Sequence, residues 1–400
     1  MGKVTSNRVR ARRRDALALA AVVAAIATAG AACGGSSSSS SVGSATSAVS
    51  AAAGDATSAA SAGAAGGDKW AVKLKDGSTF KLAPRIEDKL TKKQPANYLF
   101  SYQSSAIQGF SQQYKAGYDE SRAAAGQILP GMTFKAVAPS VPANDVPQQT
   151  AQIMALVNTN QLDCVSIEPA NSDAFTQLTN QLMAKGIPVF TVGVSTNGNE
   201  LTNFTQIPDK EGRQAAQVVL DFMKTNGKSF KTFAVSGGDP TQFWAQQRAK
   251  GFREGVMAAI PDAKFVTTET NFLNVTYDPA KTLDAYKAFL QGAGKNIDVI
   301  QNVDIGGGFA ARAIDQSPRK GLAYSIGWNV TPEQAAAIKS GTQIALFDQK
   351  WPEQAGFGAK ACATFLSTGK VLPNTQKLQV VTKENVDQVL ADQKKLVGES

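Results

Sequence analysis

The chain of 400 residues contains no histidine, which restricts the chemistry that its side chains can perform. Catalysis by Ser-His-Asp or Cys-His groups is excluded, as are the usual zinc sites that contain histidine. Carboxylates remain as candidate catalytic groups, and Glu168, Asp239 and Asp304 fall in segments that we predict to be loops. Nothing in their spacing specifies a pair at catalytic distance, so a carboxylate-based glycosidase is kept only as the less favoured alternative. The sequence predicts no enzyme, no catalytic residues, no metal site and no cofactor.

The three cysteines are Cys33, Cys164 and Cys362, and none belongs to a CxxC pair that would hold a metal or perform redox chemistry. Cys164 lies in the apolar run 162–167, and Cys362 lies in an alanine-rich segment typical of a helix. We interpret both first as buried, inert thiols. A disulfide between them is compatible with a location outside the cytoplasm, and the sequence leaves that pairing open.

The N-terminus has the composition of an export signal. Residues 1–14 are basic and residues 16–29 are almost wholly apolar, so we predict a signal peptide over residues 1–32. Small residues directly before Cys33 resemble a bacterial lipobox, in which this cysteine would carry the lipid anchor. Gly30 stands where a lipobox usually has a branched aliphatic residue, and cleavage without lipidation is therefore the alternative.

Two further segments precede the region of regular periodicity. Residues 33–67 are almost entirely Ser, Ala, Gly and Thr after the cysteine, and they cannot bury enough apolar surface to offset the entropy of ordering. We predict a lipid-anchored, flexible tether there. Residues 68–96 form an N-terminal extension in which we expect a small hairpin that turns at Asp76-Gly77.

The formal net charge of +9 is concentrated at the start of the chain, because six basic residues and Asp15 within the first 15 positions contribute +5. The adjacent Arg13 and Arg14 leave Sec and twin-arginine export both open. The remaining +4 is dispersed over the rest of the chain. This distribution does not predict a nucleic-acid surface.

From residue 97 onward, short apolar strands alternate with amphipathic helices. The predicted strands cover residues 97–103, 133–138, 163–167, 187–192, 230–236, 264–269, 298–301, 323–328 and 343–347. The predicted helices cover residues 108–125, 146–159, 174–184, 210–225, 243–259, 280–291, 307–315 and 332–339. Such alternation predicts an α/β fold of parallel sheets with helices on both faces. The strands are too many for one small doubly wound sheet, so we expect two Rossmann-like lobes with a crossing near residues 203–208.

Open α/β sheets bind ligands beyond the carboxyl ends of their strands, which makes the strand-to-helix loops the candidate site. These loops cover residues 103–110, 168–173, 192–197, 236–244, 271–278, 303–308, 328–331 and 348–352. They are rich in Asn, Gln, Asp, Ser and aromatic residues. Neutral amides and hydroxyls that donate and accept, beside flat apolar rings, suit a polyhydroxylated ligand.

Several short motifs occur in a characteristic order from residue 97 to the C-terminus. They are Gln108-Gly109-Phe110 before Lys115-Ala116-Gly117, Ile187-Pro188-Val189, Pro208-Asp209, Arg248-Ala249-Lys250-Gly251-Phe252, Ile326-Gly327-Trp328-Asn329, Asp348-Gln349 with Pro352, and Val381-Thr382-Lys383-Glu384-Asn385-Val386. No single motif is specific, but their order and spacing together resemble the ribose-type family of periplasmic sugar-binding proteins. The resemblance implies the type I periplasmic binding protein fold, with a three-strand hinge near Pro208, Gln349 and Leu378. It also implies a first lobe of residues 97–207 plus 350–378 and a second lobe of residues 208–349 plus 379–393.

The resemblance implies a set of ligand-binding residues, which are Ser104, Gln108, Phe110, Gln246, Tyr277, Asp304, Trp328, Asn329 and Gln349. Phe110 and Tyr277 match aromatic residues that stack on the sugar, and Gln349 matches an amide near the hinge. Gln246 and Asn329 replace charged groups of the family, so the site is expected to be less charged than a ribose site.

The predicted site residues have simpler interpretations as well. Phe110, Tyr277 and Trp328 are alternatively aromatic residues of the lobe cores. Asp304 is alternatively an N-cap for the following helix. The family also places an acid and an arginine where this chain has Gly193-Val194, which puts ribose itself in doubt.

The resemblance implies a monomeric solute-binding lipoprotein of an ABC importer, anchored to the outer face of the cell membrane by Cys33. It would bind a small sugar or polyol between its lobes by hinge closure and deliver it to the importer permease. A ligand-binding sensor of the same fold, acting on a receptor, is the alternative. A repressor of similar fold is disfavoured by the export signal and by the lack of a helix-turn-helix N-terminus.

Overall fold

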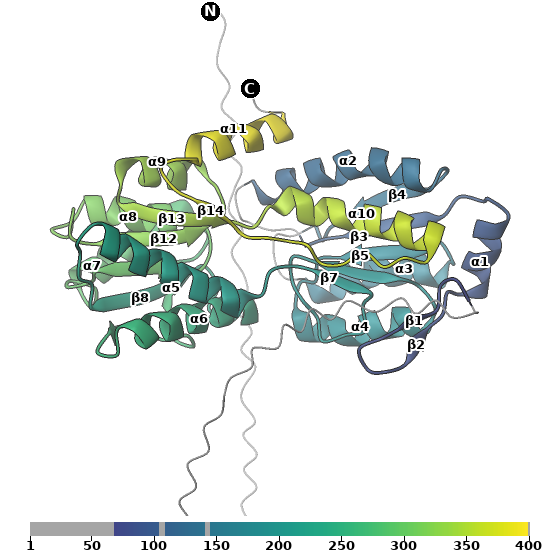
Figure 1. The fold of residues 1–400 in the computed structure, drawn as a ribbon, viewed down its shortest axis with the longest axis horizontal. Helices are drawn as coiled ribbons and strands as arrows, with labels where there is room; N and C mark the ends of the chain where they lie inside the picture. The colour runs from purple at the N-terminus through teal and green to yellow at the C-terminus, as the bar shows by residue number, and fades with distance from the viewer. Residues whose placement is uncertain (1–67, 104–108, 141–144, 399–400) are drawn as a thin grey trace, which may run out of the picture. The chain divides into compact units, whose positions relative to one another are not determined.

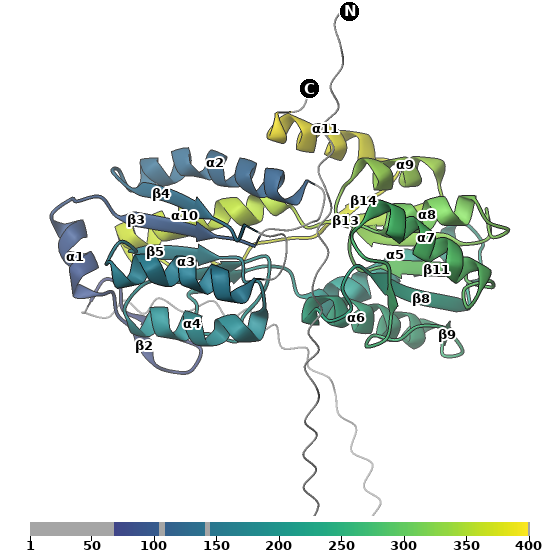
Figure 2. The same ribbon diagram turned by 180° about the vertical axis from the view of Figure 1, so that it is seen from behind.

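The computed structural model describes residues 68–103, 109–140 and 145–398. The predicted signal peptide and the predicted tether with Cys33 lie outside the described residues, as do the predicted site residues Ser104 and Gln108. Helices and strands follow one another in the predicted alternation, and the strands form two large sheets, each with helices on both faces (Figures 1 and 2).

The first sheet contains five parallel strands in the order β4-β3-β5-β6-β7. The strands are β3 (Asn97–Ser101), β4 (Thr133–Val137), β5 (Cys164–Ile167), β6 (Val189–Val192) and β7 (Thr202–Phe204). Helices α2 (Phe110–Ile128) and α10 (Trp351–Thr368) cover one face, and α3 (Val146–Asn158) and α4 (Ser172–Ala184) cover the other (Figure 1). Every residue of β5 and β6 is buried, as expected for parallel strands covered on both faces. We call this sheet and its helices the first lobe.

The second sheet has seven strands, with the order β10-β8-β11-β12-β13-β14 and with β9 paired to β8. The strands are β8 (Thr232–Gly237), β9 (Lys264–Phe265), β10 (Leu273–Asn274), β11 (Val299–Asn302), β12 (Tyr324–Trp328), β13 (Gln343–Asp348) and β14 (Gln379–Val381). Only β14 pairs antiparallel to its neighbour. This sheet and its helices form the second lobe.

The helices of the second lobe separate into two layers because side chains along a strand alternate between its faces. Phe233 and Val235 of β8 pack with α5 (Pro208–Thr225) and α6 (Phe243–Ala259), whereas Ala234 packs with α7 (Pro279–Gln291) and α8 (Gly307–Asp315). The remaining helices are α9 (Pro332–Ser340) and α11 (Val386–Val397). Val386 and Val389 of α11 pack against apolar residues of α9, β13 and β14.

Short polar side chains fix the start of several helices. Asp145, Asn171, Asp278 and Thr331 each accept a hydrogen bond from the backbone N–H three residues later, at the N-termini of α3, α4, α7 and α9. Such caps satisfy backbone donors that the first helical turn leaves unpaired. They place the preceding loops at the carboxyl edges of the sheets.

The chain passes between the two sheets three times. The crossings are residues 205–207 between β7 and α5, residues 349–350 between β13 and α10, and residues 369–378 between α10 and β14. Two Rossmann-like lobes joined by a three-segment hinge are the fold that the sequence predicts, and the prediction is confirmed.

Cys164 of β5 and Cys362 of α10 form a disulfide, with Cα atoms 6.0 Å apart. Both side chains are fully buried, but the interpretation as inert thiols is wrong because the two cysteines are bonded to each other. The bond attaches α10, which follows the second crossing, to the central strand of the first sheet.

The N-terminal extension packs on the first lobe. Strands β1 (Val72–Lys73) and β2 (Thr79–Phe80) form the antiparallel hairpin predicted at residues 76–77, and helix α1 (Pro84–Thr91) follows. Val72 and Phe80 belong to the apolar core of the first lobe. The indole N–H of Trp70 donates to the carbonyl oxygens of Phe365 and Leu366, both at 3.1 Å.

Several predicted boundaries differ from the structure. The strand expected over residues 264–269 ends at Phe265, because the hydroxyl of Thr267 takes over the pairing with the backbone N–H and carbonyl of Val235. The crossing expected at residues 203–208 begins only after Phe204, since β7 pairs with β6. The predicted ranges include none of the strands β7, β10 and β14 and none of the helices α1, α10 and α11, although the alanine-rich segment around Cys362 in α10 is typical of a helix.

Candidate ligand-binding site

Arg248 organises the carboxyl edge of the second sheet. Its guanidinium is buried, forms an ion pair with Glu211 of α5, and donates to the carbonyl oxygen of Val303 at 2.8 Å. It also lies between two indole rings, 4.9 Å from the centroid of Trp244 and 5.0 Å from that of Trp328. Cation–π contacts and charge-assisted hydrogen bonds together hold this arginine in one orientation.

Gln349 connects this arginine to the end of β12. Its side-chain oxygen accepts from Nη2 of Arg248 at 2.6 Å, and its side-chain nitrogen donates to Oδ1 of Asn329 at 3.0 Å. Asn329 has a φ of 63°, in the left-handed region that asparagine tolerates better than most residues. Gln334 donates to the carbonyl oxygens of Trp328 and Asn329, and this fixes the turn after the strand.

Asp304 lies just beyond β11 and is buried. Its Oδ2 accepts from the backbone N–H of Gly238 at 2.7 Å, and its Oδ1 accepts from that of Gly306 at 3.2 Å. Burial raises the pKa of Asp304, while these two backbone donors act in the opposite direction. The interpretation of Asp304 as an N-cap is wrong, since Gly306 is the N-cap of α8 and Asp304 instead joins the loops after β8 and β11.

Trp328 is the last residue of β12 and is fully buried. Its ring packs against Phe347 with centroids 5.0 Å apart. Among the described residues, its indole N–H has no hydrogen-bond partner. An unpaired buried donor costs free energy, so a ligand or water oxygen at this position would be favourable.

Tyr277, which follows β10, and Gln246 of α6 both contact the loop after β8. The half-buried ring of Tyr277 lies against Gly238, where a Cβ atom would come within 2.3 Å of the ring. Burial and the nearby Asp304 raise the pKa of Tyr277. Gln246 donates to the carbonyl oxygen of Pro240 at 2.9 Å, so its amide nitrogen is used within the loop itself.

Phe110 begins α2 in the first lobe and is almost fully buried. Its ring stacks on Tyr114 at 4.3 Å and meets the edge of Trp351 at 4.9 Å. Ile305 belongs to the same apolar cluster, and Tyr277 packs against that cluster. Residues of the loops after β10 and β11 of the second lobe therefore pack against the apolar core of the first lobe.

Glu168 occupies the corresponding edge of the first sheet, directly after β5. It is only 2% exposed and accepts from both the backbone N–H and the side-chain amide of Gln103, at 2.9 and 2.5 Å. Burial raises the pKa of Glu168 to about 8. Glu168 opens the predicted loop 168–173 but is not among the predicted ligand-binding residues, and its place at a strand end is the signal for a site residue.

Gly193 stands where the family resemblance implies a charged residue, and its surroundings leave little room for a side chain. Gly193 has a φ of 70°, and a Cβ atom there would lie 2.7 Å from the hydroxyl of Tyr114 and 2.9 Å from Oε1 of Gln354. Tyr114 donates to Gln354 at 2.8 Å in that space. A larger side chain is therefore excluded at this strand end.

The backbone carbonyl of Gln349 is a common acceptor for the hinge. It receives side-chain amide hydrogen bonds from Gln206 at 3.3 Å, Gln354 at 3.0 Å and Gln376 at 2.7 Å. Gln206 lies in the first crossing and Gln376 in the third, while Gln349 lies in the second. All three crossings therefore meet at one residue of the candidate site.

The structure brings together four of the predicted site residues around Arg248, namely Asp304, Trp328, Asn329 and Gln349. Phe110 belongs to the core of the first lobe and Tyr277 packs against that core, whereas the side-chain amide of Gln246, in α6, donates to the loop after β8. Arg248 belongs to one of the sequence motifs but is not among the predicted ligand-binding residues. The described residues contain no group of three or more His, Cys, Asp or Glu side chains placed to hold a metal ion. In the same part of the chain, no helix has the length and apolar character needed to cross a membrane.

Solved structures of two-lobed binding proteins share this fold. The solute-binding protein of an ABC transporter from Actinobacillus succinogenes 130z, solved with bound D-allose, matches with a TM-score of 0.62 at 16% identity, over 73% of this chain and 99% of its own. The myo-inositol-binding protein of Caulobacter gives 0.60 at 19% identity, over 73% and 95%. A periplasmic ribose ABC transporter protein of Conexibacter woesei DSM 14684 gives 0.59 at 19% identity, over 74% and 95%.

The fold and the polar strand ends thus define a two-lobed binding protein of the periplasmic type I class. The chain belongs to the periplasmic binding protein domain family, which matches residues 99–370. Comparison with curated protein sequences gives no match. As a member of this family the chain is a binding protein and not an enzyme, and the glycosidase alternative is set aside.

Proposed function

We propose that the protein is an exported solute-binding lipoprotein that binds a small sugar or polyol between its lobes and delivers it to an ABC importer. The observation that carries the proposal is the set of polar side chains at the carboxyl ends of the adjacent parallel strands β11, β12 and β13, where open α/β sheets bind ligands. Asp304, Asn329 and Gln349 offer carboxylate and amide groups there, and Trp328 offers an unpaired N–H. These groups suit hydroxyl-rich ligands.

The relatives of known structure support the ligand class. Proteins of the same fold were solved with D-allose, myo-inositol and D-arabinose, all of which are small and rich in hydroxyl groups. We assign residues 97–207 plus 350–378 to the first lobe and residues 208–349 plus 379–393 to the second. Binding to both lobes would favour the closed state by the difference in affinity between the two states.

A thermal-shift screen of the full chain against sugars, polyols, nucleosides and amino acids tests the ligand class. At a free ligand concentration about one hundred times Kd, binding to the native state adds about 2.7 kcal/mol of stability, which is readily detected. We expect a rise with one sugar or polyol that is lost in Asn329→Gly and retained in Asn226→Ala, an exposed asparagine at the end of α5. A rise only with nucleosides or amino acids would overturn the ligand class.

The lipid anchor is tested separately at Cys33. Cells fed a clickable fatty acid should label the wild-type protein and leave Cys33→Ser unlabelled, with the variant recovered in the soluble fraction. Equal labelling of the two proteins, or none of either, would contradict lipidation at this residue. Loss of uptake of the identified sugar in a strain that lacks the protein would support delivery to an importer.

A further inference from the structure

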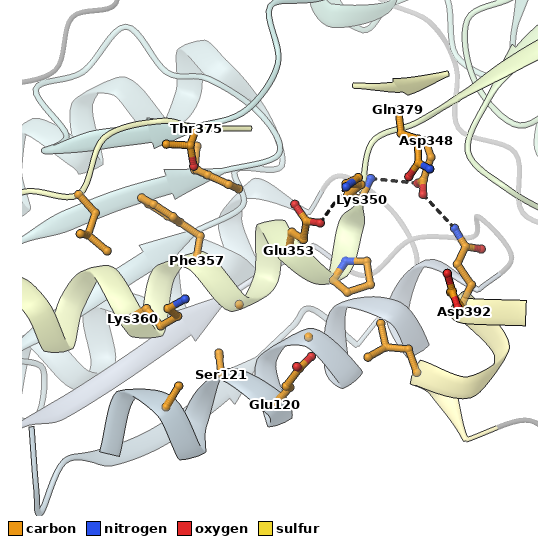
Figure 3. A pocket seen from close by; sticks show the side chains of 18 of the residues that line it. Glu120, Ser121, Asp348, Lys350, Glu353, Phe357, Lys360, Thr375, Gln379 and Asp392 are labelled. Carbon is orange, nitrogen blue, oxygen red and sulfur yellow. Dashed lines mark hydrogen bonds and ion pairs between the residues drawn. The ribbon is translucent and has the colours of Figure 1, made fainter. Parts of the chain in front are cut away.

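A groove of about 830 Å³ lies beside the second and third crossings. Its walls come from α2 and α10 of the first lobe, from β14 and α11, and from the second and third crossings (Figure 3). None of the predicted sugar-binding residues lines it. The volume is within the range of about 300–1,000 Å³ that is usual for sites of small organic molecules.

One part of the groove is apolar. The rings of Phe204 and Phe357 stack there with centroids 4.1 Å apart and planes 9° from parallel, beside Leu372 of the third crossing. Aromatic faces bind both flat apolar groups and cations. This part of the groove therefore forms an apolar surface against which the apolar part of a ligand can pack.

The polar part of the groove is acidic. Four carboxylates line it, Glu120, Asp348, Glu353 and Asp392, against the two lysines Lys350 and Lys360. Lys350 is already paired with Glu353 at 3.1 Å. The occupant that complements this lining carries positive charge.

Asp348 is the most buried of the four carboxylates that line the groove. Its carboxylate is only 6% exposed and accepts from the backbone N–H of Lys350 at 2.9 Å and from the amide of Gln393 at 3.4 Å (Figure 3). Within the described part of the chain it forms no ion pair. Burial raises the pKa of Asp348, while the hydrogen bonds from Lys350 and Gln393 and the nearby charge of Lys350 act in the opposite direction. Buried charges in proteins are usually paired.

We propose that this groove binds an organic cation, an ammonium or guanidinium group on an apolar or aromatic body, as an effector of the hinge. The cationic group lies at Asp348 and Asp392, and the apolar body lies on Phe204 and Phe357. Because the walls include both lobes and two crossings, the occupant contacts elements that must move relative to each other when the hinge bends. Binding of the cation and binding in the proposed sugar site are therefore coupled, and this coupling alone rests on the proposed function.

Three probes of similar shape and different charge test the proposal: phenethylamine, 2-phenylethanol and phenylacetate. In calorimetric titrations of the full chain without sugar, we expect the amine to bind about tenfold or more tightly than the alcohol, and the anion not to bind. Asp348→Asn and Asp392→Asn should each reduce this preference for the amine. Asp221→Asn, which removes an exposed carboxylate on α5 outside the groove, should leave it unchanged. Equal affinities of the three probes, or equal effects of the three variants, would overturn the proposal.

Location and coupling are tested with a filled groove and a second ligand. Ala124→Trp places a large ring in the groove without removing charge and should abolish binding of both the amine and the alcohol. If the amine instead competes with the sugar found in the screen, it occupies the sugar site and the groove proposal is wrong. A change in sugar affinity caused by the amine must be matched by an equal change in amine affinity caused by the sugar. The titrations without sugar remain decisive if no sugar binds at all.

Discussion

Nη2 of Arg248 lies 2.6 Å from the side-chain oxygen of Gln349, and this contact joins the carboxyl edge of the second sheet to the hinge. The carbonyl of the same glutamine accepts amide hydrogen bonds from Gln206, Gln354 and Gln376. The side chain and the backbone of Gln349 therefore have different roles. The side chain positions Arg248 and Asn329 in the candidate site, and the backbone carbonyl holds the three crossings together.

Gln349→Ala separates these two roles because it removes the side-chain amide and keeps the backbone carbonyl. The change leaves Arg248 and Asn329 each without one partner, and we expect a loss of stability of about 1–3 kcal/mol together with weaker sugar binding. Urea unfolding and calorimetric titration measure the two effects. Gln376→Ala is the matched variant, since it removes one hinge donor and leaves the site network intact. Unchanged sugar affinity in Gln349→Ala would contradict the role of this side chain.

Arg248 and Glu211 form a buried ion pair, and we expect that removing either side chain alone lowers the free energy of unfolding. The two side chains are only 5% and 3% exposed. Arg248→Met leaves a buried carboxylate without its cation, and we expect a loss of about 3–5 kcal/mol. The double variant Arg248→Met with Glu211→Leu should recover part of that loss, because no uncompensated charge remains. Lys231→Ala, which removes an exposed ion pair with Asp262, should change stability by no more than about 1 kcal/mol.

Glu168 should make stability fall as the pH rises. Its folded-state pKa of about 8 lies above the ordinary value of 4.5, so the folded protein holds a proton that the unfolded chain releases in that interval. The contribution to stability is complete below pH 4.5 and is lost as the pH rises towards 8. Burial shifts the pKa of Asp304 and Asp348 in the same direction, so the measurement is the difference between wild-type and Glu168→Gln unfolding curves from pH 5 to 9. A difference that does not vary with pH would contradict the assignment.

The elements of the fold could be predicted where hydrophobic periodicity was strong. Helix α6 has the predicted bounds, and the β-strands that form the sheet centres lie within two or three residues of the predicted ones. The short strands β7, β10 and β14 have three residues or fewer, which is too short for a period of two to show. Their pairing depends on neighbouring strands that are distant in sequence, and a local pattern does not contain that information.

The candidate site was only partly predictable for the same reason. The strand-to-helix loops were predicted to lie together because parallel strands bring their carboxyl ends to one edge, and the family resemblance selected Asp304, Asn329 and Gln349 within them. Arg248 lies within α6, and only the tertiary contacts with Glu211 and Gln349 show that it belongs to the site. The partners of Phe110 could not be foreseen either, since Trp351 is more than two hundred residues away in the chain.

The disulfide between Cys164 and Cys362 should stabilise the protein through the long segment that it closes. The two cysteines are 198 residues apart in sequence, and the helices and strands α5 to β13 of the second lobe lie between them. Restricting so long a loop in the unfolded chain is expected to contribute about 2–5 kcal/mol. Urea unfolding with and without reductant measures this, after a thiol titration in denaturant has shown that the bond is reduced. The variant with both Cys164→Ala and Cys362→Ala should be less stable than the oxidised wild type and insensitive to reductant. If the oxidised and reduced wild-type proteins unfold at the same urea concentration, the bond does not stabilise the folded state, and the apolar core around β5 and α10 alone holds the helix on the first sheet.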